Sequence, residues 1–399
     1  MATLIRTQKR KRVQPDVALL IPSYAGGGAE RVAFFVCRAL ADAGLVVDLV
    51  VARSVGPMRD EPLPRVNRVH LDVVTEFLAA PSWCRYLREA RPRVALSMVH
   101  TANLTSGLGA YVVPGVPVIV SLHYALRCGA NTQWWFRRAF GLSPERWIYR
   151  RAAKVIGVSE GLTDEAVSEF RLSTSNVATI YNPRERPDDA GEIAPEHEGL
   201  FDKPVVLGVG RLSAQKDFAM LLCAFAETTR NQDANLLILG SGPEQEALED
   251  KAAELGISDR VFLPGFVENP IAYMKRAAVF ALSSRHEGFP MVLIEAMQSG
   301  VPIVSTGCRH GPSEMLDHGR FGTIVPVGDW WALGAAITAE LEAPRDLEAT
   351  RAKRVEWLAQ FDPEIISAQY VKLVREVLSG ANGSDASRLH RQLHDVAVS

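Results

Sequence analysis

The sequence predicts an α/β protein of two Rossmann-like domains whose parallel sheets face a central cleft. Short runs rich in Val, Ile and Leu alternate with helical segments along most of the chain. Near-continuous apolar runs are typical of strands buried on both faces of a parallel sheet, and their alternation with helices is typical of doubly wound folds. The alternation breaks once, in a proline-rich stretch at 182–204, and then restarts. The 399 residues also exceed the ~150 residues of a common single domain, which favours two domains.

Ten strands are expected, five in each half of the chain. The first half gives 17–21, 46–51, 94–98, 118–122 and 154–158, and the second gives 205–209, 235–239, 261–263, 279–282 and 302–305. Between them, helical spacing is clear at 29–43, 217–229 and 243–255. The segment 363–378 has apolar residues at helical spacing, and the residues after it are polar.

These patterns divide the chain into five parts. An N-terminal Rossmann-like domain is expected at 1–184, a linker at 185–203 and a C-terminal Rossmann-like domain at 204–362. A C-terminal helix follows at 363–380, and a polar tail at 381–399.

Charge is distributed unevenly between the two halves. Residues 1–183 contain 23 Lys and Arg against 14 Asp and Glu, whereas the remainder contains 21 against 32. A basic first half indicates an anionic partner, and basic residues mixed with aromatic ones, at 134–138 and 146–151, favour peripheral contact with an anionic membrane. A further basic cluster lies at 9–12. No nucleic-acid partner is expected.

The five cysteines are far apart and form no zinc or disulfide pattern, which favours a reducing, cytoplasmic environment. The N-terminus lacks the apolar core of a signal peptide. The long uncharged stretch 101–126 is interrupted by glycines and prolines, so no membrane-spanning helix is expected.

The most informative segment is 283–306, in which two carboxylates, Glu287 and Glu295, lie eight residues apart. Pro290 suits the first turn of a helix, and Gly300 suits its end. Glu287 would then precede the helix and Glu295 lie about one turn into it. Because a helix start attracts anions, carboxylates there indicate a site that also binds sugar or ribose hydroxyls. A helix cap remains the alternative for Glu287, and a partner of the helix dipole the alternative for Glu295.

Three further groups lie where strands end. Gly26, Gly27 and Gly28 separate the first strand from a helix and allow close backbone approach to a ligand. Arg211 and Lys216 follow the first strand of the second half, where two cations could stabilise a diphosphate leaving group. His123 ends a strand of the first half. A flexible loop, a solvated charged loop and a structural histidine are the respective alternatives.

In order along the chain, these segments resemble the motifs of the retaining GT-B glycosyltransferases called group 1 or family four. The stretch from Glu287 to Glu295 looks like their E-x7-E signature, and the glycine loop at 26–31, the segment 210–217 and the segment 239–244 agree. The resemblance covers about residues 15–375. It implies a GT-B fold whose last helix crosses back to the N-terminal domain.

The resemblance also implies roles for individual residues. Arg211 and Lys216 would bind the donor diphosphate, Glu287 hydroxyls of the transferred sugar, Glu295 the ribose, and His123 the donor sugar. These implied catalytic residues are Arg211, Lys216, Glu287 and His123. The implied donor-binding residues are Gly27, Gly28, Gly210, Arg211, Lys216, Phe266, Val267, Glu287, Gly288, Phe289, Pro290, Met291, Val292 and Glu295.

The expected activity is metal-independent transfer, with retention, of a hexose or N-acetylhexosamine from a nucleotide diphosphate sugar. The chain contains no D-x-D sequence, and no cofactor or metal is implied. The segment 311–314 looks like that of relatives that use UDP-sugars. A lipid-linked oligosaccharide or polysaccharide precursor is the expected acceptor. A GDP-mannose-dependent mannosyltransferase, a sugar-nucleotide epimerase and a non-catalytic sugar-nucleotide-binding scaffold are the alternatives.

Overall fold

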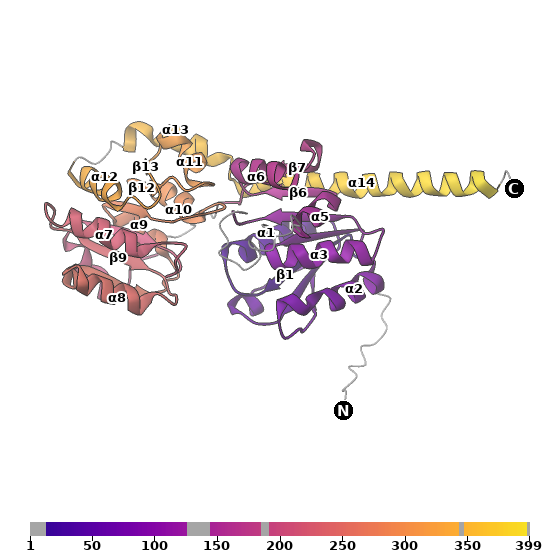
Figure 1. Ribbon diagram of the computed structural model, residues 1–399, viewed down its shortest axis with the longest axis horizontal. Coiled ribbons are helices and arrows are strands. Elements are labelled where there is room, and N and C mark those ends of the chain that lie inside the picture. The colour runs from indigo at the N-terminus through magenta and orange to yellow at the C-terminus, as the bar shows by residue number, and fades with distance from the viewer. Residues whose placement is uncertain (1–12, 126–143, 185–190, 343–346, 397–399) are drawn as a thin grey trace, which may run out of the picture.

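The computed structural model describes residues 13–125, 144–184, 191–342 and 347–396, and it consists of two parallel sheets, each enclosed by helices (Figure 1). The first sheet has the order β3-β2-β1-β4-β5-β6-β7, and the second has the order β10-β9-β8-β11-β12-β13. Within both sheets the strand order reverses beside the first strand, which is where ligands bind in doubly wound folds. The predicted pair of Rossmann-like domains is confirmed.

The first sheet has seven strands, two more than the sequence predicts. Its interior strands are β1 (Val17–Ser23), β2 (Val47–Arg53), β4 (Val94–Met98), β5 (Val118–Leu122) and β6 (Lys154–Gly157). The two additional strands, β3 (Val66–His70) and β7 (Val177–Thr179), form its edges. Edge strands are covered on fewer sides, so their sequences carry less of the apolar signal.

The second sheet has six strands and repeats this pattern. It contains β8 (Val205–Val209), β9 (Asn235–Leu239), β10 (Val261–Gly265), β11 (Val279–Leu282), β12 (Ile303–Thr306) and β13 (Thr323–Val325). The strand that the sequence does not predict, β13, is again at an edge. Strands β8 and β11 pair in the centre, so the loops that follow them lie side by side.

Helices cover both sheets. The first half contains α1 (Gly28–Asp42), α2 (Ala79–Ala90), α3 (His100–Val112), α5 (Pro144–Arg151) and α6 (Glu160–Phe170). The second half contains α7 (Phe218–Thr228), α8 (Gln245–Glu254), α9 (Pro270–Arg276), α10 (Met291–Ser299), α11 (Pro312–Met315), α12 (Trp330–Glu342) and α13 (Leu347–Ala359). The predicted helices at 29–43, 217–229 and 243–255 correspond to α1, α7 and α8, with ends shifted by one or two residues.

The last helix, α14 (Pro363–Val396), leaves the second half and packs on the first, against α1 (Figure 1). Ile366, Tyr370 and Val374 are buried in the same apolar cluster as α1 and β1. The Arg375 guanidinium donates a hydrogen bond of 3.1 Å to the carbonyl of Ala43. The helix continues to Val396, whereas the sequence predicts a polar tail from residue 381. A polar composition gives a helix no apolar face to bury, but it does not prevent the helix from forming.

Part of the segment expected to be a linker packs against the second domain. Residues Pro195–Asp202 form a 3-10 helix, and the carbonyl of Leu200 accepts a 2.8 Å hydrogen bond from Asn235 at the start of β9.

In the described part of the chain, no helix is long and apolar enough to cross a membrane. Cys37, Cys84, Cys223 and Cys308 are free thiols, and Cys128 lies outside the described residues.

Candidate functional site

Three loops at the carboxyl edge of the second sheet are held together through glycine backbones. The N–H of Gly210, after β8, donates to the carbonyl of Leu239, and the N–H of Gly240 donates to the carbonyl of Gly265. A Cβ on Gly240 would lie 1.9 Å from the carbonyl oxygen of Gly210, so no larger residue fits there without distortion. The result is an edge lined by backbone, which lets a ligand approach closely.

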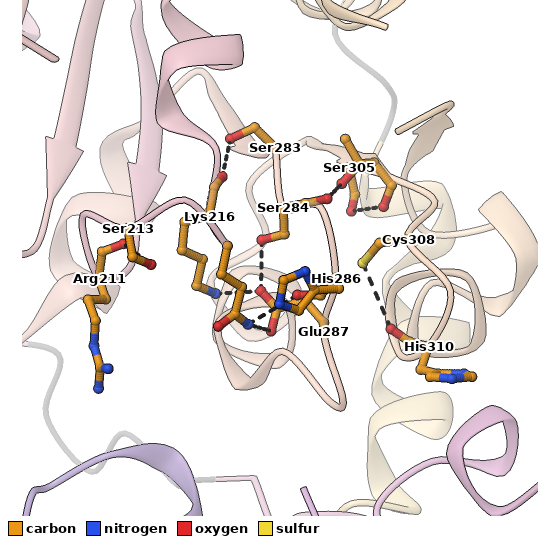
Figure 2. Close-up of polar contacts among 12 residues, drawn as sticks. Arg211, Ser213, Lys216, Ser283, Ser284, His286, Glu287, Ser305, Cys308 and His310 are labelled. Carbon is orange, nitrogen blue, oxygen red and sulfur yellow. Dashed lines mark hydrogen bonds and ion pairs between the residues drawn. The ribbon is translucent and has the colours of Figure 1, made fainter. Parts of the chain in front are cut away.

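Lys216 and Glu287 form a largely buried ion pair at this edge. The Lys216 Nζ lies 2.7 Å from Glu287 Oε1, and the two side chains are only 15% and 8% exposed. Figure 2 shows the lysine side chain extending to the carboxylate from the neighbouring loop. Ser284 Oγ also donates to Oε1 at 2.7 Å, and Gln215 Nε2 donates to Oε2 at 3.3 Å. Each polar atom of the pair is thus fixed by the protein.

The same two loops are joined outside this pair. Ser283 Oγ donates a 2.7 Å hydrogen bond to the carbonyl of Lys216. The Arg285 guanidinium binds both oxygens of Asp217, at 2.7 and 3.2 Å. Asp217 is buried and has a positive φ of 48° just before α7. These bonds hold the chain at Lys216 and at the next residue, and so they position the Lys216 ammonium group.

Arg211 differs from Lys216 although both follow β8. It is exposed, and within the described residues no hydrogen bond or ion pair holds its guanidinium. Figure 2 shows its side chain directed away from the Lys216–Glu287 pair. Burial raises the pKa of the Glu30 carboxyl of the first half, whereas the backbone N–H groups of Glu30 and Gly27 and the Arg211 guanidinium lower it. Arg211 is therefore a cation that faces the first half and is available to a ligand.

The first half meets this edge at His123, the residue after β5. A Cβ on Gly288 would lie 2.2 Å from the carbonyl oxygen of His123, so the glycine loop of the second half lies directly against it. His123 is buried, and its Nε2 lies 3.1 Å from Ser121 Oγ. Burial lowers the pKa of His123 to about 4, so its imidazole is neutral at physiological pH. A neutral imidazole can exchange hydrogen bonds with hydroxyl groups.

The glycine loop of the first half forms the start of α1. Gly27 is the N-cap residue and, as a glycine, has no side chain that could cap the helix. Gly26 before it has a positive φ of 78°. A Cβ on Gly28 would meet no atom within 4 Å. A Cβ on Gly27 would lie 2.7 Å from Glu30 Oε2, so the carboxylate bends back over the helix start. The backbone at Gly28 is therefore open to a ligand, with the Glu30 carboxylate beside it.

The remaining predicted donor-binding residues lie on α10, on the loop before it and on the segment after β10. Pro290 is the N-cap residue of α10, one position before the predicted first turn, and Glu295 is half-buried within that helix. Phe266 is 67% exposed after β10, whereas Val267 packs against the core. Phe289 and Val292 are buried, and Met291 packs against the same core.

Sequence reasoning missed several residues that the structure places at the site. Gln215 and Ser284 bind the Glu287 carboxylate, and Glu30 faces Arg211 from the first half. Their positions next to predicted residues, in the 210–217, 283–287 and 26–31 segments, were the available signal. No group of three or more His, Cys, Asp or Glu side chains is placed to hold a metal ion within the described ranges.

Both halves match known protein families. The model for "Glycosyl transferases group 1" matches residues 192–356, and the model for "Glycosyltransferase Family 4" matches residues 26–185. The chain belongs to the group 1 glycosyltransferases. The group 1 family predicted from the four ordered motifs is thereby confirmed, whereas the retaining mechanism stays a prediction.

Individual relatives and structures agree with this family. The N-acetylgalactosamine-N,N'-diacetylbacillosaminyl-diphospho-undecaprenol 4-alpha-N-acetylgalactosaminyltransferase of Campylobacter jejuni is 30% identical over 58% of this chain and 60% of its own length. The alpha-D-kanosaminyltransferase of Streptomyces kanamyceticus is 28% identical over 61% of this chain and 68% of its own. The chain thus aligns with less than two thirds of the Campylobacter relative.

Solved structures resemble the whole fold. The Anabaena protein HepE, solved in complex with UDP and glucose, superposes with a TM-score of 0.75 at 20% identity, over 91% of this chain and 100% of its own. Sucrose-phosphate synthase from Thermosynechococcus elongatus gives a TM-score of 0.74 at 22% identity, over 91% and 99%. The fold is GT-B, as predicted.

Proposed function

We propose that this protein is a retaining glycosyltransferase that transfers a hexose or N-acetylhexosamine from a UDP-sugar to an acceptor hydroxyl. The observation that carries the proposal is the position of two cations, Arg211 and Lys216, at the carboxyl edge of the second sheet, opposite His123 of the first half. A diphosphate leaving group needs fixed positive charge as its bond to the sugar breaks. Arg211 can bind phosphate oxygens in a fork, and Lys216 supplies a point charge beside them.

The environment of Glu287 favours front-face transfer. A carboxylate nucleophile must reach the anomeric carbon, whereas both oxygens of Glu287 are already bound by Lys216, Ser284 and Gln215. In front-face transfer the bond from the anomeric carbon to the leaving phosphate breaks as the acceptor oxygen attacks from the same side. The leaving phosphate accepts the acceptor's proton, so the side chains have to position the reactants and stabilise charge.

Support for UDP as the nucleotide comes from similar structures rather than from the 311–314 segment. Glu314 of that segment binds the backbone of α6, at 2.8 Å from the N–H of Glu160, so it does not need to contact a donor. HepE has been solved with UDP and with UDP-glucose. The Campylobacter relative is named for the transfer of N-acetylgalactosamine. GDP-mannose is the alternative donor.

A lipid-linked acceptor at a membrane surface is proposed from relatives and from the first half of this chain. The Campylobacter relative is named for an undecaprenol-linked acceptor. Beside β3, Val74, Phe77 and Leu78 are 88%, 78% and 62% exposed, and Trp147 on α5 is 69% exposed. The basic and aromatic clusters at 9–12 and 134–138 lie outside the described residues. Exposed apolar and basic residues together favour a bilayer interface.

A donor screen tests the proposed function. Thermal shift with UDP, GDP and ADP identifies the nucleotide, and hydrolysis of the matching sugar nucleotides identifies the sugar. Stabilisation by UDP and release of UDP from a UDP-sugar are the expected results. Stabilisation by GDP alone would favour the mannosyltransferase, and binding without any turnover would favour a scaffold.

Metal independence and membrane contact have separate tests. Because protein cations stabilise the leaving group in this proposal, turnover should persist in excess EDTA; a complete loss that magnesium or manganese restores would contradict it.

Membrane contact is tested by sedimentation with vesicles, which should show binding that rises with anionic lipid and falls with salt. Equal binding to neutral vesicles, or none, would point to a water-soluble acceptor.

A further inference from the structure

The two domains are joined by a carboxylate of the second half that binds the start of a helix in the first. Glu314, on α11, accepts a hydrogen bond of 2.8 Å from the N–H of Glu160 and one of 3.4 Å from the N–H of Gly161. These are the first two residues of α6. Ser159 Oγ accepts from the next N–H, that of Leu162, at 3.3 Å. Glu314 therefore completes the capping of a helix that belongs to the other domain.

A second contact lies one turn further along α6. His310 Nε2 is 2.9 Å from Glu165 Oε2, and the two side chains are only 4% and 2% exposed. A Cβ on Gly161 would lie 2.8 Å from His310 Nδ1, so the imidazole packs directly on the helix backbone. Arg309 lies 3.6 Å from the other oxygen of Glu165. The segment 309–314 thus holds α6 at both its backbone and its buried carboxylate.

The same segment touches the candidate donor loop. Gly311 has a positive φ of 90°, and a Cβ there would lie 2.5 Å from Pro290 and 3.3 Å from the carbonyl oxygen of Gly288. On its far side, the Gly288 loop lies against His123. Phe289 packs on Tyr181 of the first half, with ring centroids 5.6 Å apart. The donor loop is consequently enclosed between the 309–314 segment and the first half.

We propose that Glu314 and His310 are positioning residues that set the orientation of the two domains and thereby hold the Gly288–Pro290 loop against His123. The proposal rests on the function proposed above, because it takes the Gly288–Pro290 loop to bind the donor, as the family resemblance implies. Neither residue needs to touch the donor. Charged hydrogen bonds to a helix start act over short distances and in one geometry, so they fix an orientation better than apolar packing does.

The experiment measures the contact and its consequence separately. In Glu314→Ala, the amides of Glu160 and Gly161 lose their acceptor, so their hydrogen exchange should accelerate, whereas Leu162 keeps its bond to Ser159. The kcat for UDP-sugar turnover should fall about tenfold or more, because a misplacement of ~1 Å can cost up to 10²-fold. Affinity for UDP should stay unchanged, since the Arg211 and Lys216 loop is untouched.

Two variants keep the result interpretable. Glu246→Ala removes an exposed carboxylate on α8 and should change neither exchange nor kcat. Glu314→Gln keeps one acceptor oxygen and the shape, so its exchange and kcat should lie between those of the wild type and Glu314→Ala; it also serves if the alanine variant does not fold.

Faster exchange at residues 160 and 161 with an unchanged kcat would overturn the positioning role. Unchanged exchange in both Glu314 variants would overturn the contact itself. A wild-type chain that neither binds UDP nor releases it from a UDP-sugar would refute the proposed function instead, and that result is obtained before any variant is made. The exchange measurement would still decide the contact between the domains.

Discussion

The loops at the carboxyl edges of the two sheets are built differently. In the second half, Lys216 and Glu287 are paired at 2.7 Å, and glycine backbones pack so closely that a Cβ on Gly240 would overlap the next loop. In the first half, α1 begins at Gly28, where a Cβ would meet no atom within 4 Å, and the Glu30 carboxylate bends over the helix start beside it.

This difference suits two kinds of ligand. A preorganised charge site stabilises a leaving group without reorganising during the reaction, which suits a diphosphate of constant shape. An open helix start can accept groups of different size, which suits an acceptor glycan. We therefore propose that the donor diphosphate binds at the rigid edge. The acceptor would approach the open edge, beside Gly27 and Gly28, which the sequence assigns to donor binding.

The largest expected effect distinguishes the two cations of the rigid edge. Lys216→Ala and Arg211→Ala should each lower kcat by ~10²-fold or more, the scale for losing one preorganised charge-stabilising group. Only Lys216→Ala should also lower the free energy of unfolding, by about 3 kcal/mol, because it leaves a buried carboxylate without its cation. Arg211 is exposed, so its removal should leave the melting temperature unchanged.

Steady-state kinetics and denaturant unfolding of both variants check this expectation. Equal losses of stability would show that Arg211 is as structural as Lys216. Unchanged turnover in either variant would remove that residue from the diphosphate site.

A smaller effect is expected at the open edge. Gly28→Ala meets no atom of the protein, so the fold should tolerate it, yet the added methyl group would obstruct a ligand at the start of α1. We expect turnover to fall by roughly tenfold, as for a slightly misplaced reactant, with the melting temperature unchanged. Gly240→Ala is the matched comparison, since its Cβ would clash with Gly210 and should lower stability. Full activity in Gly28→Ala would mean that no ligand approaches there.

The last expected effect concerns the pH dependence of stability and not turnover. Burial lowers the pKa of His123 to about 4 in the folded protein, compared with 6.5 for an ordinary histidine. The unfolded chain therefore binds a proton between these values that the folded chain does not, so stability falls as the pH drops from 6.5 to 4. His123→Asn should lose less stability across that window, and the exposed His318→Asn should behave like the wild type. Identical slopes for His123→Asn and the wild type would show that His123 is accessible to protons.

The interior strands of both sheets could be predicted from the sequence, and so could the edge strand β10, whereas the edge strands β3, β7 and β13 could not. Runs such as Val205–Val209 are apolar on both faces because both faces are covered by helices. The missed strand Val66–His70 contains the polar residues Asn67 and Arg68, and only its first residue is buried. The missed strand Val177–Thr179 is only three residues long. Short edge strands are defined by pairing with a neighbour, and a single sequence does not contain that information.

The candidate site divides in the same way. Glycines, cations and carboxylates at strand ends could be recognised because their spacing places them on loops at one edge. The partners of Glu287 could not, since Gln215 is 72 residues away in sequence and reaches it only through the pairing of β8 with β11. The bond from Glu314 to α6 spans 154 residues and depends on how the two domains meet.

The central claim is that Arg211 and Lys216 bind the diphosphate of a nucleotide sugar, and calorimetric titration with UDP, UMP and uridine tests it most directly. The wild type should bind UDP more tightly than UMP, and UMP more tightly than uridine, because each phosphate adds charge for the two cations to bind. In Arg211→Ala the preference for UDP over UMP should shrink, while affinity for uridine stays unchanged. An unchanged ratio of UDP to UMP affinity in Arg211→Ala, or equal affinity of the wild type for UDP and uridine, would contradict the account.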